Sequence, residues 1–229
     1  MTGALNELAM ADGRRLRGER SRREILALAV DIASAEGLEG LTIGRLAGEL
    51  GMSKSGLFAH FGSKEGLQSA TVGAAAETFV SEVVAPTEGV EPGIERLDAM
   101  LEAWTSHIDC GRYRGGCFFA ATGLEFDGRP GAVRALIADL SRQWVQRIAE
   151  EARLSRELGQ LRDDVDPEQL AFETHAFVQE ANWTRQLLED DRAFDRARAA
   201  VRRRLLDAST ESGAAILKRA SEKGDRDGK

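Results

Sequence analysis

Apolar residues recur along this chain at helical spacing, and no stretch of useful length alternates as a strand would. The stretch from Ile43 to Leu50, for example, carries apolar side chains at i, i+3, i+4 and i+7, which places them on one face of a helix. The chain has only four prolines, and each lies at or near a junction between such stretches. The pattern predicts an all-α protein.

Glycine-containing turns separate the first three predicted helices, of which the second and third are short. A helix over residues 21–36 ends at Gly37, and Thr42 can cap a second helix that ends at Gly51. Ser53 can cap a third helix after the three-residue turn GMS. Two short helices joined by such a turn form a helix-turn-helix, a motif that places its second helix in the major groove of DNA.

The remaining two thirds of the chain predict longer helices that pack as a bundle. We expect them over residues 63–86, 92–109, 117–126, 130–157, 167–189 and 192–219. The chain then divides into a flexible basic arm at 1–20, a helix-turn-helix domain at 21–68, a helical bundle domain at 69–220 and a disordered tail at 221–229.

The formal net charge is −7, but the charge is unevenly spread. Six arginines and one acidic residue, Glu19, stand between positions 14 and 23. Such a segment can lie along phosphates or enter a minor groove, although a solvated tail has the same composition. The second basic run, RARAAVRRRLL, predicts a solvated face of the last helix.

Membrane, secreted and metal-binding classes receive little support from the sequence. There is no apolar run of about 18 residues and no signal-peptide pattern, so we expect a cytoplasmic protein. The two cysteines, Cys110 and Cys117, form no disulfide framework. His107 and Cys110 have the only metal-like spacing, and two ligands are too few for a closed site. We expect no metal and no other cofactor.

The third predicted helix carries small, hydroxylated and basic side chains on its outer face. Ser55, Gly56 and Ala59 are small enough to let the helix approach a groove. Lys54 can reach a phosphate or a guanine edge, and Ser53 and Ser55 can donate to phosphates or bases. These residue types in this order favour DNA binding.

Two further positions bear on that interface. Lys64 stands in the first turn of the fourth helix, where its charge opposes the helix dipole. A phosphate bound at this helix end would make the position favourable, because it would accept from the ammonium group and the backbone amides together. His60 either packs locally or contacts a phosphate, and both interpretations stay open.

The segment LTIGRLAGELGMSKSGLFAHFGSKEGL resembles the DNA-binding core of tetracycline-repressor-type (TetR family) transcriptional regulators. The resemblance covers about residues 21–68 and rests on the ordered set Gly51, Ser53, Leu57, Phe58, His60, Phe61, Lys64, Glu65 and Leu67. The positions that match the family's DNA-facing residues are Thr42, Lys54, Ser55, Gly56, Phe58, His60 and Lys64. We add Arg22, from the basic run, and Ser53 to complete the expected DNA interface. Phe58 departs from the family pattern, which usually has a tyrosine whose hydroxyl contacts phosphate.

The resemblance implies a homodimer that reads the two half-sites of a palindromic operator in double-stranded DNA. It also implies a small-molecule effector in the C-terminal bundle that releases the DNA, as expected of a repressor. An activator or a corepressor-dependent factor fits the same sequence, because the sign of the response depends on coupling and promoter position. An all-α enzyme or small-molecule carrier is the alternative from another class, although no catalytic triad or phosphate loop is present.

Residues of the bundle supply candidates for the effector site and the dimer interface. Aromatic and histidine side chains could line a pocket, although aromatic residues at helical spacing more often belong to the core. The ligand-binding candidates are Trp104, His107, Phe118, Phe119, Phe126, Trp144, His175 and Trp183. We expect the last two helices to form the dimer through Leu170, Phe177, Trp183, Leu187, Phe194, Val201 and Leu205.

Overall fold

The computed structural model describes the backbone of residues 2–227 and the side chains of residues 18–220 and Glu222. Its elements are helices, which confirms the predicted all-α class. In chain order they are α1 (Thr2–Gly40), α2 (Ile43–Leu50), α3 (Lys54–Phe61), α4 (Lys64–Phe79), a π-helical turn (Val80–Val84), a 3₁₀ turn (Ala85–Thr87), α5 (Ile94–Asp109), α6 (Phe118–Phe126), α7 (Ala132–Glu157), α8 (Pro167–Leu188), α9 (Ala193–Ala208) and α10 (Glu211–Asp227).

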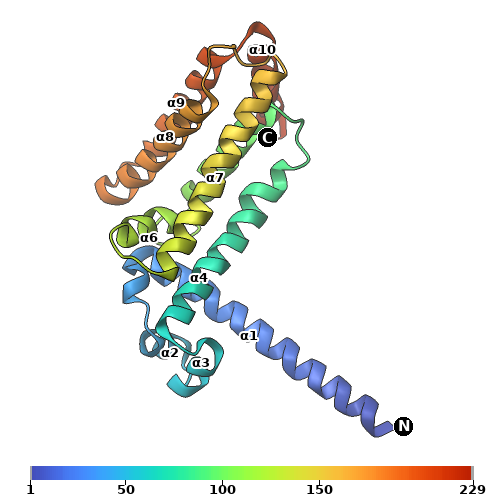
Figure 1. Ribbon diagram of the computed structural model, residues 1–229, viewed down its shortest axis with the longest axis vertical. Coiled ribbons are helices and arrows are strands. Elements are labelled where there is room, and N and C mark those ends of the chain that lie inside the picture. The colour runs from blue at the N-terminus through green and yellow to red at the C-terminus, as the bar shows by residue number, and fades with distance from the viewer. Residues whose placement is uncertain (1, 228–229) are drawn as a thin grey trace.

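The helices arrange as a small head and a larger bundle. Helices α2 and α3 lie at one end of the molecule beside the start of α4, and α8 and α9 run side by side towards the other end (Figure 1). The long helices α4 and α7 connect the two regions, and the N-terminal half of α1 points away from both (Figure 1).

Helix α1 is longer than the predicted helix over 21–36. Its backbone is helical from Thr2, so the basic run continues along the axis of the same helix. Gly37 leaves the helical region (φ 78°, ψ 162°), so the predicted end at this glycine is a kink followed by one more turn. The side chains of residues 1–17, including Arg14, Arg15 and Arg17, lie outside the described residues, as do those of the predicted tail apart from Glu222.

The predicted last helix over 192–219 is wrong, because the structure divides it into α9 and α10. Ser209 has an extended backbone (φ −76°, ψ 153°) and forms an isolated antiparallel bridge with Leu161. The Thr210 hydroxyl then accepts from the Gly213 amide at 3.3 Å, which caps the start of α10. Local hydroxyl caps compete with the continuing helix at this point.

The head and the bundle share a hydrophobic core. Leu46 and Leu57, from α2 and α3, are completely buried in a cluster that also contains Phe126 of α6 and Ile137 of α7. A second cluster fills the bundle between α5, α7, α8 and α9. The core of the head is therefore completed by Phe126 and Ile137, which follow Leu57 by more than 60 positions in the sequence.

Gly48 offers a test of how far helix propensity limits the head. This residue is exposed in α2, and apart from its chain neighbours and the backbone of its own helix no atom lies within 4 Å of the place that a Cβ would take. We expect Gly48→Ala to raise the free energy of unfolding by about 1 kcal/mol, because alanine favours the helix over glycine. Urea denaturation followed by circular dichroism measures the change.

Gly51 provides the matched control for this prediction. It ends α2 in the left-handed region (φ 62°), where a Cβ is unfavourable. Gly51→Ala should therefore lower the free energy of unfolding by about 1–2 kcal/mol. Changes of the same sign at both glycines would contradict the assigned backbone conformations.

Candidate DNA-binding head and ligand cavity

Hydroxyl caps fix the start of the two helices of the helix-turn-helix. The Thr42 side chain accepts from the Arg45 amide at 3.0 Å, and the Ser53 side chain accepts from the Gly56 amide at 3.1 Å. Both hydroxyls still carry a hydrogen, which each can donate to a phosphate. Thr42 and Ser53 can thus position the helices and contact DNA at the same time.

The outer face of α3 is open and carries an unpaired cation. Lys54, Ser55 and Phe58 are exposed, while Gly56 and His60 are half-buried. Among the described residues Lys54 has no ion-pair partner. Its ammonium group is therefore available to a phosphate or a base edge without first breaking an interaction within the protein.

Lys64 has a partner inside the head, which changes the interpretation of its position. Its Nζ lies 2.8 Å from Oε2 of Glu39, and Gln68 Nε2 donates to Oε1 of the same carboxylate at 3.1 Å. These hydrogen bonds hold the pKa of Glu39 below its usual range. The carboxylate thus compensates the cation at the helix start, and a phosphate would have to compete with Glu39 for Lys64.

Arg22 positions α3 from α1. Its Nη1 donates to the carbonyl oxygen of His60 at 2.7 Å, and its guanidinium lies 4.7 Å from the centre of the Phe61 ring. The C-terminal end of α3 is therefore held by a hydrogen bond and a cation–π contact. The DNA contact predicted for Arg22 would have to coexist with this structural role.

Glu125, at the end of α6, joins the bundle to the head. Its two carboxylate oxygens accept from the amides of Leu38, at 2.7 Å, and Glu39, at 2.9 Å. These amides open the short turn after the kink at Gly37, so Glu125 acts as a cap supplied from a distant helix. The neighbouring Glu39 is the partner of Lys64.

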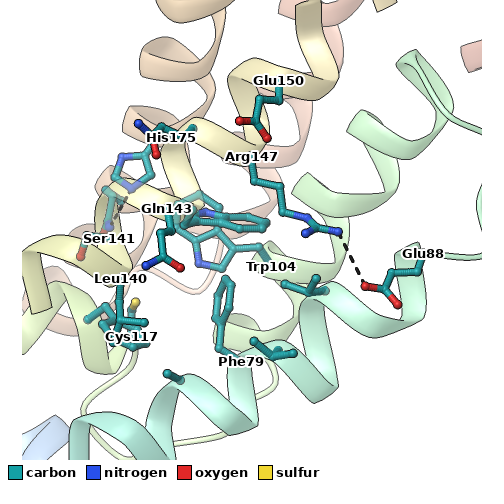
Figure 2. Close-up of a pocket in the computed structure, with 17 residues that line it drawn as sticks. Phe79, Glu88, Trp104, Cys117, Leu140, Ser141, Gln143, Arg147, Glu150 and His175 are labelled. Carbon is teal, nitrogen blue, oxygen red and sulfur yellow. Dashed lines mark hydrogen bonds and ion pairs between the residues drawn. The ribbon is translucent and has the colours of Figure 1, made fainter. Parts of the chain in front are cut away.

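A cavity of about 500 Å³ lies within the bundle, between α4, the π-helical turn, α5, α7 and α8. Figure 2 shows Phe79 and Trp104 in its centre, His175 to one side and the Arg147–Glu88 pair to the other. Its size suits a drug-sized molecule. Of the predicted ligand-binding residues, the cavity wall contains Trp104, Phe119, Trp144 and His175.

The other four predicted ligand-binding residues do not line this cavity. Phe118 and Phe126 are buried in the core shared with the head. The Nδ1 atom of His107 lies 3.0 Å from a Glu82 carboxylate oxygen, and Trp183 is 47% exposed on α8. Helical spacing alone cannot separate core positions from a cavity wall.

Several lining residues were not predicted from the sequence. Most of them are polar residues of α7, and the others lie at the end of α4 and on α8. They include Phe79 of α4, Gln179 of α8, and Leu140, Gln143, Arg147 and Glu150 of α7. On α7, Gln143, Gln146, Arg147 and Glu150 recur at i, i+3, i+4 and i+7 beside the apolar stripe of that helix, and this spacing is the signal that could have found them.

The centre of the cavity is aromatic, and few of its lining residues are charged. The charged lining residues are Glu88, Arg147 and Glu150, and the Arg147 guanidinium lies 3.9 Å from the Glu88 carboxylate. His175 stacks on Trp104 with ring centres 5.1 Å apart, and burial lowers the pKa of its imidazole. Burial therefore favours the neutral form of this imidazole.

The predicted dimer residues also divide between core and surface. Leu170, Phe194, Val201 and Leu205 are buried within the chain and provide no exposed face, because they form the core between α8, α9 and the rest of the bundle. Phe177 is half-buried against the same core. The other two predicted residues, Trp183 and Leu187, are exposed on α8, as are Phe172 and Leu188, which were not predicted.

Within the described residues, no group of three or more His, Cys, Asp and Glu side chains could hold a metal ion. None of the helices in that part of the chain has the length and apolar character to cross a membrane.

Family comparisons agree with the geometry of the head. The family model described as "Bacterial regulatory proteins, tetR family" matches residues 25–71, which contain α2 and α3. A second model, "Tetracyclin repressor-like, C-terminal domain", matches residues 93–201. The chain belongs to the TetR family of transcriptional regulators. No curated protein matches it.

Solved structures show the same fold at low identity. A TetR transcriptional regulator from Chloroflexus aurantiacus is 24% identical, with a TM-score of 0.74 over 81% of this chain and 93% of its own. A regulator from Saccharomonospora viridis in complex with choline is 23% identical, with a TM-score of 0.68 over 80% and 94% of the two chains. AibR, in complex with isovaleryl coenzyme A and operator DNA, is 22% identical, with a TM-score of 0.64 over 78% and 94%. As a TetR regulator, this chain is a DNA-binding regulator of transcription.

Proposed function

We propose that this TetR regulator is a homodimeric repressor that binds a palindromic operator and leaves it when a small molecule enters the bundle cavity. We assign it no catalytic activity. The observation that carries the proposal is the path of α4, which begins beside α3 at Lys64 and ends at Phe79 in the cavity wall. One rigid helix, about 24 Å long, thus joins the two sites.

The connection at the cavity end of α4 favours a response to a ligand. The helix continues there as a π-helical turn, and Val80 and Val84 of this turn line the cavity. Such turns are irregular segments that often occur at functional sites. A molecule that displaces Phe79 would move the C-terminal end of α4. Because α4 moves as one body, its N-terminal end would move with α3 and change the distance between the two recognition helices of a dimer.

The exposed apolar side chains of α8 support a dimer. Phe172, Trp183 and Leu187 are 67%, 47% and 63% exposed and recur at intervals close to whole helical turns, so they share one stripe. A soluble protein seldom leaves such a stripe uncovered, and a second copy of the chain would cover it with the same stripe. The two α3 helices would then read half-sites about 34–36 Å apart.

Two proteins of the same fold support the proposed partners, operator DNA and a small-molecule effector. Their sequence identities to this chain are low and by themselves show only the shared fold. AibR was solved with a coenzyme A thioester and operator DNA, and the Saccharomonospora viridis regulator with choline. These molecules differ in size and charge, so they support an effector site in the bundle without specifying its ligand.

The proposal is tested by selecting bound sequences from random duplex DNA with the full chain. We expect a palindrome, bound by two chains, as measured by sedimentation of the complex. A metabolite screen should then find compounds that release the selected duplex. Enrichment of no sequence, or of single half-sites bound by one chain, would oppose the proposal.

A further inference from the structure

The loop between α5 and α6 (residues 110–117, the α5–α6 loop) contacts the head on one side and the bundle on the other. The Gly115 amide donates to Ser34 Oγ of α1 at 3.1 Å. The Cys117 amide donates to Asn182 Oδ1 of α8 at 2.9 Å. Helix α1 packs mainly on α4 and α6, and α8 packs mainly on α7 and α9. The α5–α6 loop therefore joins two helices that belong to different parts of the molecule.

Two adjacent glycines allow the loop to approach both helices closely. A Cβ on Gly115 would lie 1.9 Å from the backbone oxygen of Ser34. A Cβ on Gly116 would lie 2.4 Å from Oδ1 of Asn182, and the backbone of Gly116 is left-handed (φ 76°). Neither position has room for a side chain, so a larger residue at either one would have to displace the helix or side chain beside it.

Helix α1 extends these contacts to the recognition helix α3. The backbone amide and Nε of Arg114 donate to the two carboxylate oxygens of Asp31 on α1, at 3.0 and 2.6 Å. Arg22, nine positions before Asp31 on the same helix, holds the C-terminal end of α3. Nine residues of helix span about 14 Å. Contacts thus run from α8 through the α5–α6 loop and α1 to α3, on a path separate from α4.

The other end of this path lies beside the apolar stripe proposed for the dimer. Asn182 is 8% exposed and directly precedes Trp183 of the stripe. Gln186, whose Nε2 lies 2.7 Å from the place of a Cβ on Gly116, directly precedes Leu187 of the stripe. Helix α8 therefore carries both the contacts to the loop and the exposed stripe.

We infer that the α5–α6 loop is a tether that fixes the recognition helix relative to the dimer helix, and that Asn182, which closes the tether, determines how strictly the dimer selects the spacing of its half-sites. The inference rests on the proposed function in taking α8 as the dimer helix. A firmly held head rejects an operator whose half-sites lie at another distance, because one of the two heads must then move from its position. Asn182 acts here as a positioning residue, through the loop and α1.

Operators with one base pair added to or removed from the centre of the selected palindrome test the tether on the full chain. We expect the unmodified chain to prefer the original spacing strongly and Asn182→Ala to show a preference about tenfold smaller, as the loss of a coupling contact predicts. The matched control is Thr184→Ala, because the Thr184 hydroxyl donates to Glu180 on the surface of the same helix. This variant should keep the preference. Fluorescence anisotropy measures the ratio of the dissociation constants for the altered and original spacings.

Two variants within the loop test the tether from its other end. Gly115→Ala should reduce the spacing preference at least as much as Asn182→Ala, because its methyl group cannot fit without moving α1. Gly123→Ala is its control, since only its chain neighbours and its own helix backbone lie within 4 Å of the place of that Cβ. Arg114→Ala removes only an exposed side-chain bond to Asp31, so it should fold like the unmodified chain and reduce the preference several-fold.

Hydrogen exchange of the free chain tests the tether without DNA. In Asn182→Ala the amides of residues 31–36 of α1 should exchange faster by a larger factor than those of α7, because release of the loop loosens α1 locally. A variant that only weakens the whole fold would accelerate both helices alike.

Two results would overturn the inference: exchange in α1 that is unchanged or follows α7, and a spacing preference that Asn182→Ala and Arg114→Ala both leave intact. Failure of the full chain to select a palindrome, or binding by a single chain, would instead oppose the proposed function. Hydrogen exchange would in that case still decide whether the loop tethers α8 to α1.

Discussion

Lys54→Ala is expected to lower the affinity of the dimer for its selected operator about 100-fold. Lys54 is the exposed cation of α3 that no described residue pairs, so its full charge is available to DNA. A loss of about 1.4 kcal/mol in each subunit gives this factor. The slope of log affinity against log salt should also fall by about 2, one for each lysine lost. Fluorescence anisotropy of a labelled operator at several salt concentrations measures both quantities.

The Lys64–Glu39 pair provides the matched control for this prediction. Lys64→Ala should weaken binding less than Lys54→Ala, because DNA must first draw Lys64 from its carboxylate partner. Glu39→Gln should raise affinity several-fold, since it removes a negative charge near the phosphates and leaves Lys64 unpaired. Unchanged affinity and salt slope in Lys54→Ala would exclude α3 as the DNA-contacting helix.

Glu125→Ala should lower the free energy of unfolding by about 2 kcal/mol. The change removes an ionised acceptor from two backbone amides, those of Leu38 and Glu39, and leaves both near the kink without a cap. Glu125→Gln keeps one acceptor oxygen and should cost about half as much. Urea denaturation measures the three free energies.

Leu124 gives the control at the neighbouring position. It is 73% exposed on the same helix, so Leu124→Ala should change stability by less than about 0.5 kcal/mol. If Glu125→Ala had an equally small effect, the capping contact between α6 and the kink in α1 would contribute nothing to the folded state.

The head was largely predictable because its signals are local. Gly51 can adopt the left-handed backbone that ends α2, and Ser53, two residues later, caps the next helix. Each such signal is read within four residues along the chain. The division at Ser209 has a local part, the Thr210 cap of α10, and a distant part, the bridge to Leu161 across 48 positions, which no local pattern could reveal.

The partner of Lys64 and the residues that line the cavity could not be predicted, because contacts between residues distant in the sequence determine them. The isolated helix dipole made Lys64 look unfavourable, and only the folded chain reveals Glu39 beside it. Likewise, Phe118 and Phe119 are neighbours in sequence, yet one fills the core and the other faces the cavity. A helical period gives the direction of a side chain but not whether protein or open space lies there.

The core shared by head and bundle sets a condition for sensor engineering. A chimera that joined residues 25–71 to the bundle of another regulator would divide this cluster, in which α1 packs on α6 and α4 packs on α7, and would remove Phe126 and Ile137 from it. The graft would start with a cavity at its junction and without the Glu125 cap. A transplantable DNA-reading unit therefore has to carry α6 and the first turns of α7 with it, so the exchangeable module is discontinuous in sequence.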